Sequence, residues 1–336
     1  MVKRGWSVGV VLALLLSPAV VYGSPWTLPA DDLVVSADFG AQNASQEFLQ
    51  DGTRQDYPLE ANHRTSSISI TARYGFTDRL EGALRLSISQ VGYTANPLIL
   101  NEELADREEA IDSIVNFNTI EFGASDAYLR TNYRLFSPLG GLGRITASLE
   151  GKLPTGYDDP TGTFFFDRDG TERQGGQATL GDGQVDITPR ILAGVVIPQT
   201  STFIRGDAGF RYRFGAPGHQ VTGGFRLGQM LGDHLIIMGG MNGDYTVRQG
   251  DVIGETVITD DPSLTAAEFN LDNLIFEDLR LDRDRLNAEV GFLVDLGDVE
   301  LTANYSRTIR GSNTGVVNAF NVGTILTLPD VTNRGE

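Results

Sequence analysis

The three histidines of this chain are the side chains best suited to acid–base chemistry near neutral pH. His63 and His219 fall in connections between predicted strands, and His234 lies beside a short turn. A lipid hydrolase built on His219 would need a nucleophilic serine and an acid beside it, and no suitably flanked serine accompanies any of the three. We therefore favour a solvent-exposed role for His219 and predict no catalytic residue.

Metal and cofactor chemistry is equally sparse. Asp167, Asp169 and Gly170 resemble the start of a calcium-binding loop, but no Glu follows at the twelfth position. The chain has no Cys, which excludes disulfides, a lipid-modified cysteine and paired-cysteine metal sites. Glycine-rich phosphate loops and basic nucleic-acid patches are also missing from the sequence. We predict no cofactor, no metal and no nucleic-acid partner.

Alternation of apolar and polar residues is the strongest pattern in the sequence. Between residues 204 and 214, one face carries Arg205, Asp207, Arg211 and Arg213, whereas the other is apolar and aromatic. The same period of two recurs at 144–153 and 285–295, and it predicts strands with one apolar and one charged face. The sequence predicts about 12 such strands. They cover residues 33–41, 64–75, 79–92, 118–136, 144–153, 183–197, 202–214, 220–230, 234–247, 284–295, 298–310 and 315–328.

The connections between these strands alternate in length. Every second connection is short, and the long ones lie at 93–117, 154–182 and 248–283. The short ones are 76–78, 137–143, 198–201, 231–233 and 296–297. Such sorting is typical of an all-β, transmembrane, up-and-down antiparallel β-barrel with short periplasmic turns, long external loops and both termini in the periplasm. A soluble β-sandwich is the alternative, but it has no reason to sort its loops.

The first residues predict export. Lys3 and Arg4 precede an apolar run from Val8 to Leu16, which is the pattern of a cleaved signal peptide over residues 1–23. A retained anchor is the alternative, but the run is shorter than the ~20 residues that a membrane helix needs. We therefore predict one barrel domain, 24–336, in the outer membrane of a Gram-negative cell. Its expected partners are membrane lipid, lipopolysaccharide and the barrel-assembly machinery.

The charged faces of the strands should point into the lumen, because a lipid-facing charge is costly. The predicted lumen-lining residues are Arg73, Arg85, Arg130, Arg134, Glu150, Lys152, Arg190, Arg205, Asp207, Arg211, Arg213, Arg226 and Glu289. A barrel of this size falls between those that side chains fill and the open barrels of about 16 strands. We favour a narrow, partly wet lumen whose arginines indicate anionic solutes. The alternative is an interior sealed by ion pairs.

The long loops are rich in Asp and Glu. A solvated loop surface is favoured over divalent cations that bridge the loops to lipopolysaccharide, because runs of charge are usually solvated.

Four segments carry a resemblance to a known family. They are GFTDRLEGALRL (75–86), GASDAYLRTNYRLF (123–136), GKLPTGY (151–157) and LGDGQVDITPRI (180–191). In these segments the chain resembles the outer-membrane transporter family associated with phenol-degradation meta-pathway clusters. The resemblance implies passage of small, often aromatic or hydrophobic compounds, and it brings no catalytic residues. The sequence departs from the family in its long acidic loops and in continuing past its last strand, from Pro329 to Glu336.

We thus predict a non-enzymatic outer-membrane channel or transporter for small solutes, either aromatic or hydrophobic compounds or small anions. A structural or adhesive barrel that contacts lipopolysaccharide through its acidic loops is the alternative, and a lipid hydrolase is the third hypothesis.

Overall fold

The structure is a computed structural model that describes residues 24–96, 98–99, 114–115, 118–157, 164–166, 172–174, 179–259, 274–280 and 282–332. The predicted signal peptide and the candidate calcium-loop residues Asp167, Asp169 and Gly170 lie outside the described residues. Among the residues described, no helix has the length and apolar character needed to cross a membrane.

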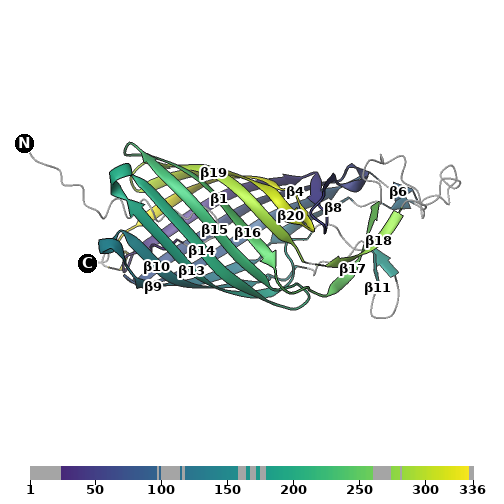
Figure 1. The fold of residues 1–336 in the computed structure, drawn as a ribbon, viewed down its shortest axis with the longest axis horizontal. Helices are drawn as coiled ribbons and strands as arrows, with labels where there is room; N and C mark the ends of the chain where they lie inside the picture. Colours follow the sequence, from purple (N-terminus) through teal and green to yellow (C-terminus); the bar gives the residue numbers. More distant parts are fainter. Residues whose placement is uncertain are drawn as a thin grey trace, which may run out of the picture.

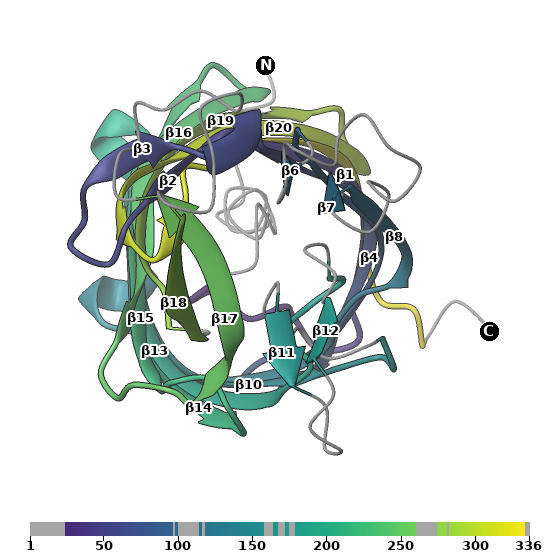
Figure 2. The same ribbon diagram turned by 90° about the vertical axis from the view of Figure 1, so that its right-hand side faces the viewer.

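One antiparallel sheet closes on itself and forms a barrel, which Figure 2 shows end-on as a ring. Its strands are β1 (Leu33–Ala44), β4 (Asn62–Thr77), β5 (Leu80–Thr94), β8 (Thr119–Ala124), β9 (Ala127–Phe136), β10 (Gly143–Leu153), β13 (Val185–Ile197), β14 (Thr202–Phe214), β15 (Gln220–Leu231), β16 (Leu235–Thr246), β19 (Asp284–Asp295), β20 (Val299–Ser312) and β22 (Asn318–Leu328). Strands β8 and β9 both pair with β5 and together make one interrupted strand, so the barrel has 12 strands. The first and last strands, β1 and β22, pair along their length and close the ring. The predicted all-β, up-and-down barrel is confirmed.

The short connections all lie at the end of the barrel that carries both termini (Figure 1). Two of them contain short 3-10 helices, η4 (Leu139–Gly141) and η5 (Pro198–Thr200). Ser201, which follows η5, has a φ of 52° and turns the chain back into β14. These tight turns hold neighbouring strands in a fixed register.

The opposite end of the barrel carries additional small sheets. Strands β2 (Gln46–Phe48), β3 (Arg54–Asp56) and β21 (Thr314–Gly315) form one, and β6 (Leu98–Ile99) pairs with β7 (Ile114–Val115). A third contains β11 (Phe164–Phe166), β12 (Glu172–Gln174), β17 (Val252–Thr259) and β18 (Leu274–Arg280). This third sheet joins two of the long connections, 154–182 and 248–283, and stands beyond the barrel end in Figure 1.

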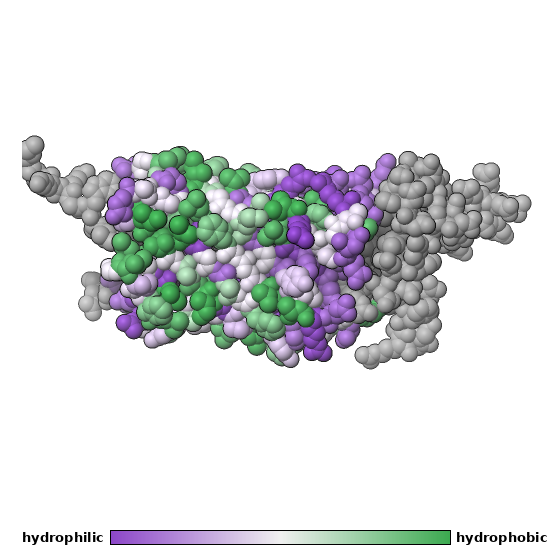
Figure 3. Space-filling model, in the orientation of Figure 1, coloured by the Kyte–Doolittle hydropathy of each residue, from purple (hydrophilic) through white to green (hydrophobic). Residues whose placement is uncertain are grey.

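The outward face of the barrel is apolar where a membrane would surround it. Outward side chains such as Ile68 and Ile70 on β4 are 59% and 55% exposed, although β-branched apolar residues usually lie buried. Hydrophobic residues gather over the half of the barrel nearest the termini, and hydrophilic residues gather toward the far end (Figure 3). An apolar band around a polar interior is the arrangement of a membrane-spanning barrel.

Candidate functional site

The barrel lumen is the candidate site, because the strand pleat turns the charged face of each strand inward. Residues two apart share a face, so one inward residue fixes the others on its strand. On β10, the inward positions Ser148, Glu150 and Lys152 are all buried, whereas the outward Leu149 and Leu153 are exposed. Each of the 13 sequence-predicted lumen residues occupies such a strand face in the described barrel, on β4, β5, β9, β10, β13, β14, β15 or β19.

Most of these charges are paired with a carboxylate on another strand, either the neighbouring strand or the next one round the barrel. Arg73 and Glu81 form a fork with a shortest distance of 2.8 Å, and both are nearly fully buried. Arg130 contacts Glu150 at 2.7 Å, directly across the β9–β10 pair. The remaining pairs of this kind are Arg190–Asp207 at 3.1 Å, Arg211–Asp244 at 3.4 Å and Arg226–Glu289. Pairing lowers the net positive charge that these strands present to the lumen.

A cluster of charges stands where β10 and β13 reach the external end. Lys152 lies 3.5 Å from Asp126 and 3.3 Å from Asp186, and it also contacts Asp182. Arg213 contacts Asp182 and Asp186 from the other side. Burial raises the pKa of the Asp182 carboxyl, but Lys152 and Arg213 outweigh burial and hold that pKa below its ordinary value. The two cations thus keep this carboxylate ionised and tie the loop before β13 to the barrel wall.

Tyr157 completes the external cluster from the start of the long 154–182 connection. Its hydroxyl donates a hydrogen bond to Asp126 and accepts one from the backbone N–H of Gly183 at 3.2 Å. A Cβ at Gly181 would lie 2.0 Å from the Tyr157 hydroxyl, so only glycine leaves room for this ring. Gly181 and Gly183 belong to a segment that carries the family resemblance, and their place here follows from packing.

Three of the predicted lumen residues have surroundings of other kinds. Arg205 is 9% exposed and lies beside Asp207 and Arg226 around a small cavity. Arg134 is half-buried near the end with the short turns, facing Arg144. Arg85 is half-buried on β5 and donates a hydrogen bond to Ser69 at 3.1 Å, and no ion pair within 4.0 Å is recorded for it among the residues described.

The segment before the first strand lies inside the barrel, which the sequence did not predict. Trp26 and Leu28 are each 1% exposed and pack among inward apolar residues at the end with the short turns. Those residues are Val34, Val196, Phe203, Ile236, Met238, Leu293 and Ile325. We call Ser24–Leu28 the N-terminal segment. It closes this end of the lumen with an apolar core.

Hydrogen bonds and one glycine hold the N-terminal segment in place. Thr146 donates its hydroxyl to the Pro25 carbonyl at 2.6 Å, and the Leu28 N–H donates to Glu81 at 3.0 Å. Trp26 lies over Gly194, where an added Cβ would come within 2.6 Å of the indole ring. The sequence signal for this contact is weak, because the two apolar residues between Pro25 and Pro29 are too few to establish a pattern.

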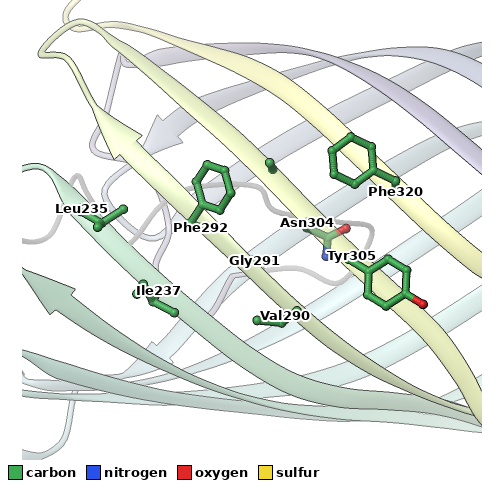
Figure 4. Close-up of a pocket in the computed structure, with 9 residues that line it drawn as sticks. Leu235, Ile237, Val290, Gly291, Phe292, Asn304, Tyr305 and Phe320 are labelled. Carbon is green, nitrogen blue, oxygen red and sulfur yellow. The ribbon is translucent and has the colours of Figure 1, made fainter.

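A second concave site lies on the outside of the barrel (Figure 4). It has a volume of about 340 Å³ between β16, β19, β20 and β22. Phe292, Tyr305 and Phe320 surround it, and Gly291 and Ala303 form its small-residue floor. Its lining is almost wholly apolar and it faces the lipid side of the wall, so it is separate from the polar lumen.

The described residues around His219 do not form the catalytic arrangement that a lipid hydrolase needs. His219 lies 4.4 Å from Tyr212 between ring centroids, and its Nδ1 accepts from the Arg213 backbone N–H at 3.4 Å. No hydrogen bond joins it to a serine within the described part of the chain. Those described residues also contain no group of three or more His, Cys, Asp or Glu arranged to hold a metal ion.

The chain is a closed transmembrane β-barrel of 12 strands with a charged, partly filled lumen. No family model matches the sequence, and no curated protein matches it. In structure the chain is similar to the COG4313 outer membrane channel from Pseudomonas putida F1, with 9% identity, a TM-score of 0.59, and coverage of 92% of this chain and 100% of that one. It is also similar, with a TM-score of 0.46 and 14% identity, to the translocator domain of the autotransporter NalP from Neisseria meningitidis, over 95% of this chain and 94% of that one. At these identities the likeness shows the fold alone, and membership of the family that the sequence resembles stays a prediction.

Proposed function

We propose that this chain is an outer-membrane channel or transporter for small solutes and that the N-terminal segment closes its periplasmic end. The observation that carries the proposal is a closed barrel, apolar outside and polar inside, in which part of the inward wall stays half-exposed beneath the external end. Accessible polar groups along the lumen wall are what a passage for small solutes requires.

Within the predicted range of solutes, the interior favours uncharged compounds over small anions. The arginines that should attract anions are mostly neutralised by carboxylates, as in the Arg190–Asp207 and Arg226–Glu289 pairs. An ion crossing such a lumen meets little net charge, and selectivity by charge is weak where rings of one sign are missing.

Conductance across a planar lipid bilayer tests the proposal. We expect the refolded protein to give small single-channel currents with weak ion selectivity, and Trp26→Ala to raise the conductance because it empties the core around the N-terminal segment. Swelling of liposomes in small neutral solutes extends the test to molecules that carry no current. Wild-type protein and Trp26→Ala that both pass neither ions nor neutral solutes would contradict a channel function.

A structural or adhesive barrel is the second candidate. The buried ion pairs and the apolar core around Trp26 favour it, because both make the barrel rigid and closed. The external sheet of β11, β12, β17 and β18 would then be the contact surface toward lipopolysaccharide or other cells. Deletion of this sheet should change adhesion or envelope integrity with solute uptake unaltered if this candidate is right, whereas the channel predicts that uptake depends on the lumen.

A further inference from the structure

The two sides of the lumen are unequally filled. On β10 and β13, the inward residues Ser148, Glu150, Thr188 and Arg190 are each at most 6% exposed, because their ion pairs pack the space in front of them. On the other side of the lumen, both buried and half-exposed residues occur along the inward faces of β4 and β5. The half-exposed inward residues of this side include Asp38, Ser67, Thr71, Ala83, Arg85, Ser87, Thr302, Asn304, Ser306 and Asn321. Accessible surface therefore remains on the inward faces of β1, β4, β5, β20 and β22, and also on β9, β14 and β19, whereas the inward side chains of β10 and those of β13 from Asp186 to Leu192 are buried.

Short hydroxyl side chains line the side of β4 and β5: Ser67, Thr71 and Ser87 are half-exposed, whereas Ser69 and Ser89 are buried. The hydroxyls of Ser69 and Ser87 lie 2.8 Å apart across the β4–β5 pair. The hydroxyls of Ser89 and Ser125 lie 3.1 Å apart one step nearer the external end. We call the inward face of β1, β4 and β5 the hydroxyl wall. It offers donors and acceptors to a passing solute with little bulk.

Two opposite charges meet in the middle of the hydroxyl wall. Asp38 on β1 stands opposite Ser69 in register, and Arg85 on β5 donates to the same Ser69 hydroxyl at 3.1 Å. The Asp38 carboxylate accepts from Ser36 at 3.2 Å and lies over Gly323, where any Cβ would come within 2.2 Å of it. Among the described residues, neither Asp38 nor Arg85 has a recorded ion pair within 4.0 Å. Both are half-buried, so both charges remain available to the lumen.

We infer that solutes move along the hydroxyl wall and that the opposite charges of Asp38 and Arg85 balance each other there, which makes its charge selectivity weak. This inference rests on the proposed channel function and names its selectivity residues. Because the two charges are opposite and adjacent, their electrostatic effects on a charged solute nearly cancel. The wall therefore suits small uncharged solutes with hydrogen-bonding groups. Removing one charge exposes the field of the other.

Single cysteines test the path directly, because the natural chain has none. Thr71→Cys places a thiol on the hydroxyl wall beside Arg85 in register, and Ser148→Cys places one on the filled side. Reaction with small methanethiosulfonate reagents from the aqueous phase should be at least tenfold faster at position 71 than at position 148. Ser87→Cys serves as a second probe on the wall if Thr71→Cys fails to fold. Equal rates on the two sides would overturn the path.

The charge assignment is tested in the same background with reagents that carry a sulfonate or a trimethylammonium group. At roughly 7 Å in water, Coulomb's law gives about a threefold change in local concentration per unit charge, before salt screening. Arg85→Gln should therefore slow the anionic reagent and speed the cationic one by up to threefold each, and Asp38→Asn should do the reverse. The matched control is Arg64→Gln, which removes an exposed arginine from the outward face of β4, the strand that carries the cysteine at position 71.

Outcomes separate the inference from the function beneath it. A rate ratio that stays constant in both Arg85→Gln and Asp38→Asn, or that shifts equally in Arg64→Gln, overturns the selectivity assignment even if the protein conducts. Wild-type protein and Trp26→Ala that pass neither ions nor neutral solutes, with the predicted cysteine pattern intact, would instead leave an accessible wall in a barrel that is not a channel.

Discussion

A single added methyl group at Gly194 should release the N-terminal segment. Gly194 faces the lumen on β13, and a Cβ there would lie 2.6 Å from the Trp26 ring and 2.7 Å from Pro25. Both atoms belong to buried rings, the Trp26 indole and the Pro25 pyrrolidine, so neither atom can rotate away from the new Cβ. Overpacking of this kind costs about 1–3 kcal/mol. Gly194→Ala therefore shifts the equilibrium between the bound and released segment by roughly five- to 150-fold.

Tryptophan fluorescence reports the release. The chain has two tryptophans, and Trp6 lies in the predicted signal peptide, so protein that begins at Ser24 has Trp26 as its only tryptophan. We expect Gly194→Ala to move the Trp26 emission to longer wavelength and to raise its quenching by acrylamide, because the indole leaves its core beside Phe203. Gly151→Ala is the control, because the nearest atom to a Cβ added there is a backbone oxygen on β9 at 3.9 Å, which is an ordinary contact distance. Emission and quenching that match the parent protein in Gly194→Ala would refute the placement of Trp26 over Gly194.

Three further predictions concern the barrel wall. Lys152→Met should lower the free energy of unfolding in urea by about 3–5 kcal/mol, because it leaves Asp126 without its cation and leaves Asp182 and Asp186 to share Arg213 alone; a loss below about 1 kcal/mol would contradict this. The pKa of Asp182 is lowered in the folded protein from its ordinary value of 3.8, so its contribution to stability is complete above that value and is lost as pH falls through the lower, folded pKa. Urea titrations between pH 7 and pH 3 should show this decline, and Asp182→Asn should make the decline shallower. Ile70→Arg places a charge on the lipid-facing middle of β4 and should cost about 2–4 kcal/mol when the protein unfolds from lipid vesicles, whereas Ile70→Val should cost far less.

The strands could be predicted from the sequence because residues that face lipid alternate with residues that face the lumen, and this alternation appears as a period of two in hydrophobicity. Each predicted range falls on a strand of the barrel, and 118–136, predicted as one strand, appears as β8 and β9 with a break at Ser125 and Asp126. Tight turns such as the one at Ser201 leave the chain no alternative but to return beside itself. The small external sheets were not predicted, because β11 and β12 span only three residues each and show no alternation.

The N-terminal segment shows a different limit of sequence reasoning. Trp26 and Leu28 bind to the inside of a barrel that only exists once all strands have paired, so the contact is non-local on every side. No local pattern encodes it. Composition offered one signal, two large apolar side chains directly after the predicted cleavage site and before the first strand, and such residues are rarely left in water.

The ion pairs divide according to the connection that joins their strands. Arg213 and Asp186 stand opposite each other on β13 and β14, whose turn fixes the register, so this contact could have been worked out from the turn alone. Lys152 faces Asp186 in the same way on β10 and β13, but a long connection joins those strands and leaves their register open to the sequence. The Arg226–Glu289 pair spans two strands and passes over Gly240, where a Cβ would lie 3.1 Å from the Glu289 carboxylate. Inward charges can thus be predicted from one strand, yet their pairing depends on registers that long connections do not set. For this reason the sequence predicts many inward arginines but not which of them are paired, and an anion path stays a prediction.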